Sequence, residues 1–191
     1  MRYIETMRLE NGNIQNHEYH IARVIRTIGS EAAQRVNLDP IVPIQFSLGT
    51  VKCRVVYDEN GVHDIHYSHY QIPQIKTLKI VECNDINYEF KYEDRTQINN
   101  LMQQRGLCDD IIITQNGKVT DSSFCNILFK NKDGLFTSDT PLLLGTKREQ
   151  MIHDRLMKAV PITTQDILHY DQIILVNAMM SIEIDIKNVI L

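Results

Sequence analysis

The chain has 191 residues, of which 43% are hydrophobic and 23% are charged, and its formal net charge is -4. This composition is typical of a globular protein that forms one substantial domain or two small ones. It excludes a strongly basic surface for nucleic acid, and no block of lysine and arginine indicates binding to an anionic membrane.

Residues that bind metals or direct secretion do not form the usual patterns. The four cysteines are widely spaced with no CxxC pair, so we expect them to be small buried side chains in a reducing compartment. His63, His66 and His69 lie at strand spacings that do not converge, and no metal is predicted. Glu5 falls where a signal peptide needs an apolar run, and no stretch is long enough for a membrane span. The cytoplasm is the expected location.

The N-terminal half favours a small α+β arrangement. Residues 2–9 are predicted to form a strand, and residues 17–36 a helix with Asn16 as a candidate N-cap. Asn60-Gly61 is a strong signal for a hairpin between two further strands. The extended, proline-containing segment 71–75 is the best candidate for a connection between domains.

The C-terminal half has a different pattern. Short apolar runs alternate with helical segments, and tight-turn residues separate the central runs. We therefore predict a small domain over residues 1–74 and a larger domain, mostly antiparallel, over residues 75–191. The expected strands of the larger domain are 77–83, 109–115, 124–130 and 172–180, and its expected helices are 95–105 and 147–159.

Three features along the chain suggest one kind of chemistry. Lys91 comes just before a predicted helix, and Arg95 lies one turn further on, where its charge would favour a partly neutral lysine amine. Asp121 follows an apolar strand and a hairpin, and a buried carboxylate there needs a positive partner. Gly145-Thr146 opens a predicted helix, where backbone N–H groups and the helix dipole bind phosphate well.

Together these features match what pyridoxal phosphate requires. The amine forms an imine, the carboxylate holds the proton of the pyridine nitrogen, and the helix start holds the phosphate. Each feature also has an ordinary interpretation: a solvated loop lysine, a turn aspartate and an N-cap that binds nothing. Arg23 on the first helix is a further candidate for the phosphate, and Asn177 ends an apolar strand where its donors would face a pocket.

In this order the motifs resemble the class IV pyridoxal phosphate aminotransferases, the fold type IV group that includes D-amino acid aminotransferase and aminodeoxychorismate lyase. The resemblance covers nearly the whole chain and rests on the segments Tyr3–Arg8, His20–Val24, Lys91–Arg95, Asp109–Phe129, Thr140–Arg148 and Asn177–Met180. It implies a small N-terminal α/β domain, a larger C-terminal domain of mostly antiparallel strands with helices, and a homodimer.

The resemblance also implies the site. Lys91 would carry the cofactor and act as the catalytic base. The cofactor-binding residues would be Arg23, Lys91, Asp121, Gly145, Thr146, Lys147, Asn177 and Ala178. Arg8, Arg54 and Arg95 are candidates to hold substrate carboxylates. Asp121 departs from the family pattern, which has a glutamate at that position.

Within the family, the segment Asn177–Met180 and the spacing of Lys91 and Arg95 are more similar to the lyase. The implied reaction converts 4-amino-4-deoxychorismate, a small amine, to 4-aminobenzoate and pyruvate. An amino acid aminotransferase of branched-chain or D-amino acid type is the first alternative. The family's opening segment is not found in this sequence, so a non-catalytic member that binds the cofactor weakly is the second.

Overall fold

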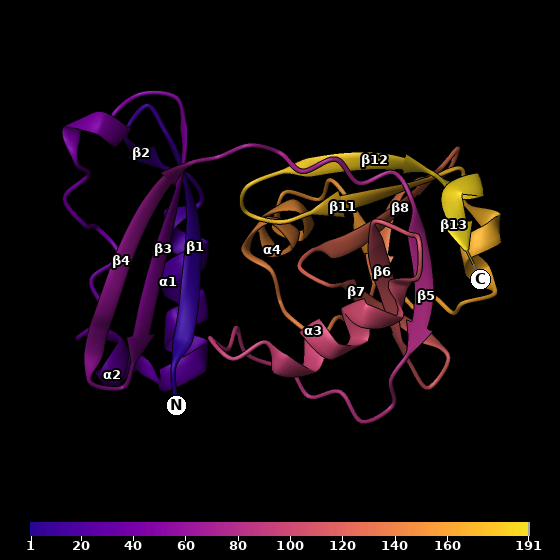
Figure 1. The fold of residues 1–191 in the computed structure, drawn as a ribbon, viewed down its shortest axis with the longest axis horizontal. Helices are drawn as coiled ribbons and strands as arrows, with labels where there is room; N and C mark the ends of the chain where they lie inside the picture. The colour runs from indigo at the N-terminus through magenta and orange to yellow at the C-terminus, as the bar shows by residue number, and fades with distance from the viewer. Residues whose placement is uncertain (191) are drawn as a thin grey trace. The chain divides into compact units, whose positions relative to one another are not determined.

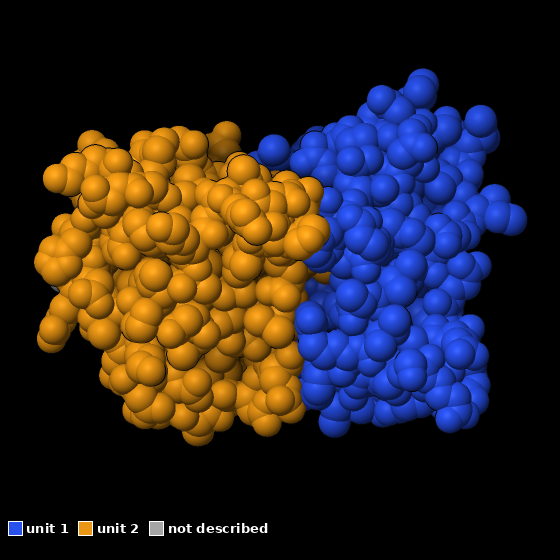
Figure 2. All heavy atoms as spheres, turned by 180° about the vertical axis from the view of Figure 1, so that it is seen from behind, with its two compact units in different colours: residues 1–72, 90–94 blue, residues 73–89, 95–191 orange. Residues whose placement is uncertain are grey.

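The computed structural model describes residues 1–190, and the chain divides into two compact units (Figures 1 and 2). Unit 1 contains Met1–Ile72 and Phe90–Asp94, and unit 2 contains Pro73–Glu89 and Arg95–Leu191. The chain therefore enters unit 2, returns to unit 1 for five residues, and then completes unit 2. This return was not foreseen in the predicted division after residue 74, and it brings Lys91 into unit 1.

Unit 1 is a four-stranded antiparallel sheet with the strand order β2-β1-β3-β4. The core forms where alternate side chains of β1 and β3, such as Met7 and Val55, pack with Val24 of the first helix. The elements are β1 (Tyr3–Glu10), β2 (Asn13–Ile14), α1 (His17–Ile28), α2 (Ser30–Ala33), the 3₁₀ turn Ile44–Phe46, β3 (Thr50–Asp58) and β4 (Gly61–His69).

The predicted strand over residues 2–9 and the hairpin at Asn60-Gly61 are confirmed in unit 1. The predicted helix over residues 17–36 is too long, because α1 ends at Ile28 and Gly29 has a φ of 83° that a continuing helix cannot use. Asn16 is the N-cap residue, as predicted, although its φ is 53° and its side chain makes no capping hydrogen bond.

Unit 2 contains a nine-stranded sheet in which most neighbours are antiparallel. Its elements are β5 (Leu78–Glu82), α3 (Thr96–Met102), the 3₁₀ turn Gln103–Arg105, β6 (Asp110–Gln115), β7 (Lys118–Ser122), β8 (Asn126–Asn131), β9 (Gly134–Ser138), α4 (Thr146–His153), β10 (Lys158–Val160), the 3₁₀ turn Asp166–His169, β11 (Gln172–Val176), β12 (Ser181–Asp185), the 3₁₀ turn Ile186–Asn188 and β13 (Val189–Ile190).

The centre of unit 2 is formed by β6, β8 and β11, whose apolar runs are buried without alternation. Such continuous burial is typical of strands that are covered on both faces. Strand β7 pairs with β6 on one side, and it pairs with β8 through the single residue pair Asp121 and Asn126. Asp121 therefore lies in a strand rather than in the turn that the sequence suggested.

Two elements of unit 2 also differ from the predicted ones. The helix predicted over residues 147–159 stops at His153, because Arg155 has a φ of 57° and the chain then forms β10 beside β9. The strand predicted over residues 172–180 is β11 followed by a turn into β12. The overall class is nevertheless the predicted α+β fold, with a small first unit and a larger, mostly antiparallel second unit.

No helix within residues 1–190 is long and apolar enough to cross a membrane. Over the same range, no three side chains of histidine, cysteine, aspartate or glutamate are grouped so that they could hold a metal ion.

Candidate active site

A buried ionic cluster connects β1 and α1 in unit 1. The Glu5 carboxylate accepts hydrogen bonds from Nδ1 of His20 at 2.5 Å and from Nε and Nη2 of Arg23 at 2.7 and 2.5 Å. Burial alone would raise the pKa of Glu5, but the charge and hydrogen bonds of Arg23 and the hydrogen bond of His20 lower it to about 2. Glu5 is therefore ionised at neutral pH and holds the guanidinium in one orientation.

Arg23, which was predicted to contact a cofactor phosphate, binds Glu5 in this cluster. Its side chain is buried, and two of its nitrogens bind Glu5, which no pattern in the sequence had indicated. The planar guanidinium suits this two-point contact because its donors are fixed in a fork. The predicted contact between Arg23 and a cofactor phosphate stays a prediction.

Lys91 lies in a short segment that is anchored to β1. The amide of Ile4 donates to the carbonyl of Lys91 at 2.9 Å, and the amide of Tyr92 donates to the carbonyl of Phe90 at 2.9 Å. The second bond spans two residues, so Lys91 is the central residue of a γ-turn. The rings of Phe90 and Tyr92 both pack on Tyr3, with centroids 6.1 and 5.6 Å away. The backbone at Lys91 is thus held from both sides by unit 1.

Two of the arginines proposed for substrate binding have carboxylate partners within unit 1. The Nε of Arg8 donates to Glu10 at 2.7 Å, and Nη2 of Arg54 lies 3.2 Å from a carboxylate oxygen of Glu93. Both pairs are partly exposed, so solvent screens them. Replacing the carboxylate of Glu10 or Glu93 by a substrate carboxylate would therefore cost little free energy. Their predicted roles are not tested by these contacts.

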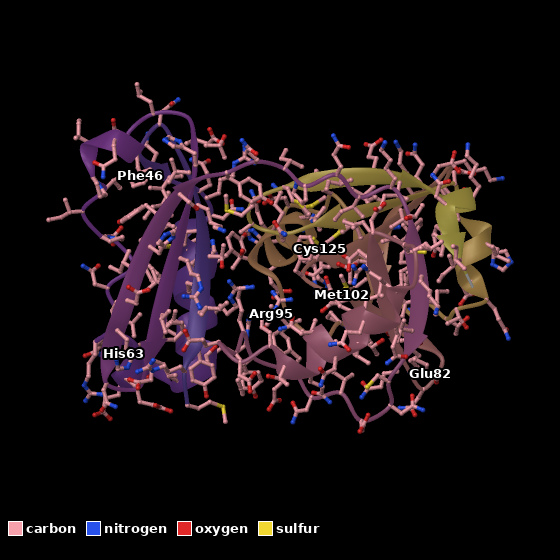
Figure 3. All side chains as sticks on the ribbon, in the orientation of Figure 1. Phe46, His63, Glu82, Arg95, Met102 and Cys125 are labelled. Atoms are coloured by element: carbon pink, nitrogen blue, oxygen red, sulfur yellow. The ribbon has the colours of Figure 1, made fainter. Side chains whose placement is uncertain are left out.

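Arg95, which belongs to unit 2, has unused donors. Arg95 is labelled in Figure 3. Its Nη2 donates to the Ser123 carbonyl at 2.6 Å, whereas its Nε is buried without a hydrogen-bond partner among the described residues. A buried guanidinium nitrogen without an acceptor is costly, and an added carboxylate would satisfy it. Of the three arginines predicted to bind substrate, Arg95 has the contacts that fit this role best.

Asp121 is a buried carboxylate whose hydrogen-bond donors are neutral groups. Its Oδ1 accepts a hydrogen bond from Nδ2 of Asn126 at 2.7 Å, and its Oδ2 accepts one from the amide of Leu143 at 2.9 Å. Burial raises the pKa of Asp121 to about 6, against the opposing hydrogen bonds of Leu143 and Asn126 and the charge of Arg148.

A hydrogen bond connects Asp121 to the segment just before α4, because Asp121 accepts from the amide of Leu143 and the helix begins at Thr146. Gly145 precedes the helix in an extended conformation, and Thr146 is its first residue. The Thr146 hydroxyl is buried without a partner in the described part of the chain. An unsatisfied donor at a helix N-terminus is suited to an anion, because the exposed N–H groups and the helix dipole act in the same direction.

Lys147, the next residue of α4, has a side chain that does not extend beyond the helix. Its Nζ donates to Gln150 at 3.0 Å, one turn further on. The phosphate role predicted for this residue therefore depends on its backbone N–H and on the general positive charge of its side chain.

The side chain of Asn177 is used to shape the turn between β11 and β12. Its Oδ1 accepts from the amides of Met179 and Met180 at 2.8 and 3.1 Å, and its Nδ2 lies 3.2 Å from Sγ of Cys125. These bonds tie the turn to the loop that follows β7. The predicted contacts of Asn177 and Ala178 with a cofactor would therefore come from the backbone, and they stay predictions.

Sequence reasoning missed two residues of the site. Asn126 holds Asp121 directly, and Arg148 is buried and lowers the pKa of that carboxyl through its charge. Asn126 lies within the segment Asp109–Phe129 that resembles the family, but it was given no role. The signal that would have found it is its position at the start of the strand after Asp121, which places the two residues opposite each other across a short connection.

The fold and these residues define a class of protein. A model of the amino-transferase class IV family matches residues 89–184, which include Lys91, Asp121 and the start of α4. The chain therefore belongs to the class IV aminotransferase family.

Similar proteins support that assignment over nearly the full chain. An uncharacterized protein of Haemophilus influenzae is 40% identical over 183 residues, covering 92% of this chain and 96% of its own. Among solved structures, a protein of Haemophilus somnus provisionally named 4-amino-4-deoxychorismate lyase has 31% identity and a TM-score of 0.81, covering 93% of this chain and 96% of its own. A hypothetical aminotransferase of Mycobacterium tuberculosis in its PLP-bound form has 12% identity and a TM-score of 0.73, with 96% and 80% covered.

The residues on this chain fit pyridoxal phosphate. A buried carboxylate without a cation suits a protonated pyridine nitrogen, and a buried, unpartnered hydroxyl at a helix start suits a phosphate. The fit does not depend on the family glutamate, because aspartate provides the same carboxylate.

Proposed function

We propose that this chain is a pyridoxal phosphate-dependent lyase that converts 4-amino-4-deoxychorismate to 4-aminobenzoate and pyruvate. The observation that carries the cofactor is Asp121, a buried carboxylate that only neutral donors hold in place. Such a group is costly unless a cation binds it, and the protonated ring nitrogen of the cofactor is a cation of the right kind. The similarity to the Haemophilus somnus protein supports the lyase reaction.

Each residue would have a separate task. When bound, pyridoxal phosphate supplies an electron sink that makes a neighbouring C–H bond of an amine substrate acidic. Lys91 would hold the cofactor through Nζ, and the same atom would take up the substrate proton as the general base. Asp121 would keep the proton on the ring nitrogen, and Thr146 with the N–H groups of α4 would hold the phosphate.

A carboxylate-bearing substrate fits the arginine that the structure leaves with an unused donor. Nε of Arg95 is buried and lacks an acceptor among residues 1–190. 4-Amino-4-deoxychorismate carries carboxylates, and one of them would satisfy that donor. An amino acid would do the same, so an aminotransferase on this scaffold remains the alternative function.

The first experiment mixes the purified chain with pyridoxal phosphate, records the visible spectrum, reduces the mixture with borohydride and maps the labelled peptide. We expect a visible band and a reduced adduct on Lys91. Lys91→Ala should lose both, whereas Lys132→Ala, which removes an exposed turn lysine, should keep them. An adduct spread over surface lysines would refute the cofactor assignment and leave the non-catalytic alternative.

The second experiment separates the two reactions. The loaded protein is incubated with 4-amino-4-deoxychorismate while 4-aminobenzoate and pyruvate are measured, and in parallel with pairs of amino acids and keto acids. Release of both products without an added keto acid supports the lyase. Transfer of the amino group to a keto acid, without release of 4-aminobenzoate, supports the aminotransferase instead.

Two further statements about the protein are proposals of the same kind. The family resemblance implies a homodimer, which sedimentation equilibrium of the purified chain would test. The composition and the absence of cysteine pairs in the sequence favour a cytoplasmic location, which fractionation of the source cells would test.

A further inference from the structure

The side chain of Asn126 lies at the centre of the Asp121 site. It is 6% exposed, and it is the first residue of β8, directly opposite Asp121 in β7. Its Nδ2 makes two hydrogen bonds, one to Oδ1 of Asp121 at 2.7 Å and one to the carbonyl of Leu143 at 2.8 Å. Both hydrogens of this amide nitrogen are therefore used.

Leu143 closes the arrangement. Its amide donates to the other oxygen of Asp121 at 2.9 Å, while its carbonyl accepts from Asn126. The two side chains and one backbone residue thus form a closed ring of hydrogen bonds. Leu143 precedes the first residue of α4 by three positions, so the ring also determines where that helix begins.

The amide oxygen of Asn126 lies close to Gly145, the residue before α4. A Cβ atom added to Gly145 would lie 2.0 Å from Oδ1 of Asn126, a separation that real atoms do not reach. Gly145 has a φ of -71°, so its backbone conformation would accept any residue. The need for glycine at this position comes from the close approach of Asn126, not from the dihedral angles.

We propose that Asn126 is a positioning residue. It fixes the position of the Asp121 carboxylate relative to the phosphate-binding start of α4. This proposal rests on the proposed function, because it assigns these two groups to the ring nitrogen and the phosphate of one cofactor. A neutral amide is suited to the task, since it orients the carboxylate without supplying the charge that the ring nitrogen must supply. A lysine or arginine at position 126 would neutralise Asp121 instead.

The proposal predicts how variants behave. Without the amide, Oδ1 of Asp121 loses its side-chain donor, which favours the protonated acid that cannot hold the ring proton. Asn126→Ala should therefore weaken pyridoxal phosphate binding by about ten- to a hundredfold, the usual effect of losing a hydrogen bond to a charged group. The loss should be smaller at higher pH, where Asp121 ionises again.

Gly145→Ala provides an independent test through a double-mutant cycle. In the wild-type background the new methyl group displaces the Asn126 amide, so affinity should fall about as much as in Asn126→Ala. In the Asn126→Ala background the methyl group has room, and Gly145→Ala should change affinity by less than about threefold. If the glycine is needed for the phosphate itself, Gly145→Ala would lower the affinity equally in the wild-type and the Asn126→Ala backgrounds. The proposed coupling would then be wrong.

The measured quantities are the dissociation constant of pyridoxal phosphate across pH 6 to 9 and the urea unfolding of the apoprotein. Thr137→Val is the matched control, because it also removes a buried hydrogen bond, from Thr137 to the Ile127 carbonyl at 2.8 Å, but it does not contact Asp121. If Asn126→Ala does not fold, Asn126→Ser, which keeps one donor, replaces it.

The outcomes separate the two proposals. If the wild-type chain binds the cofactor and Asn126→Ala binds it as Thr137→Val does, with the same pH profile, Asn126 has no positioning role and only this inference is overturned. If the wild-type chain does not bind pyridoxal phosphate at any pH tested, the proposed function is overturned and the inference with it.

Discussion

Glu5 in unit 1 and Asp121 in unit 2 are both buried carboxylates, and the two groups have opposite surroundings. Glu5 in unit 1 binds the guanidinium of Arg23 and the ring of His20, and its pKa is lowered to about 2. Asp121 in unit 2 binds an amide side chain and a backbone amide, and its pKa is raised to about 6. Burial disfavours charge in both places, and the presence or absence of a hydrogen-bonded cation decides whether the pKa is lowered or raised.

The difference separates a structural carboxylate from one that is available for function. The charge of Glu5 is satisfied within unit 1, so it contributes to folding and to the orientation of Arg23. The Asp121 carboxylate is oriented by neutral donors but forms no hydrogen bond to a cation. A bound cation would therefore add a favourable charge interaction that is missing in the apoprotein. A buried acid held by neutral donors is therefore the more informative sign of a binding site.

The sharpest test makes the same carboxylate-to-amide change at both positions. Glu5→Gln leaves the buried guanidinium of Arg23 without its counter-charge, and we expect the unfolding free energy of the apoprotein to fall by about 3–5 kcal/mol at pH 8. Asp121→Asn removes an uncompensated charge at the cost of one hydrogen bond, so we expect a loss no larger than about 1 kcal/mol. Urea unfolding measures both.

Equal losses in the two variants would contradict the comparison. Asp121→Asn should also bind pyridoxal phosphate far more weakly than the wild-type chain, because an amide does not hold the ring proton. This second measurement distinguishes a carboxylate reserved for the cofactor from one with no role.

The pH dependence of apoprotein stability should show both groups with opposite signs. The lowered pKa of Glu5 adds stability that is present above its unfolded value of 4.5 and is lost as the pH falls toward 2, in total about 3 kcal/mol. The raised pKa of Asp121 acts in reverse. Its contribution is present below 3.8 and is lost as the pH rises through 6, again about 3 kcal/mol.

Denaturant unfolding between pH 3 and pH 8 would check this. The decline between pH 4 and pH 6 should become smaller in Asp121→Asn and persist in full in Glu5→Gln. A remainder is expected in Asp121→Asn because burial also raises the pKa of Asp110, and an undiminished decline would contradict the role given to Asp121.

The third prediction concerns the unpartnered hydroxyl at the start of α4. Thr146→Val keeps the shape of the side chain and removes the buried donor. We expect the apoprotein to be as stable as the wild-type chain or slightly more stable, since an unsatisfied group is removed, and the affinity for pyridoxal phosphate to fall by about tenfold. A titration followed by fluorescence would measure the affinity, and an unchanged value would mean that the hydroxyl does not face the phosphate.

The smallest effect is expected at Lys147. Its Nζ donates to Gln150. Lys147→Gln should therefore remove a positive charge near the helix start without removing a direct contact to the phosphate. Such charges contribute about 0.3–1 kcal/mol, which corresponds to less than about a sixfold change in affinity. Repeating the titration at two salt concentrations checks the explanation, because the difference between wild type and variant should shrink at the higher one.

Much of the secondary structure was predictable because it depends on local patterns. The strand at residues 2–9, the hairpin at Asn60-Gly61 and the central apolar strands of unit 2 all follow from alternation, turn residues or continuous apolar runs. The two helices were predicted too long because a residue with a positive φ ends each of them near Gly29 and Arg155. Glycine often ends a helix and could have signalled the first end, whereas an arginine rarely adopts a positive φ and gives no such signal.

The candidate site was proposed from residue types along the chain, whereas its contacts were not foreseen. Lys91, Asp121 and Gly145-Thr146 were selected from their order along the chain and their resemblance to a family, and their roles stay predictions. The binding of Arg23 by Glu5 and of Asp121 by Asn126 was not foreseen. Both contacts join different secondary-structure elements, and spacing along one element says nothing about them.

The sequence by itself determined the fold class, the family and the candidate chemical groups, because these depend on periodicity and on motifs that are continuous in the chain. Only the tertiary structure decided which buried carboxylate receives a cation, that residues 90–94 join unit 1, and that Gly145 must be glycine. The reason is physical. The charge state of a buried group depends on the few atoms around it, and those atoms come together only when distant segments pack.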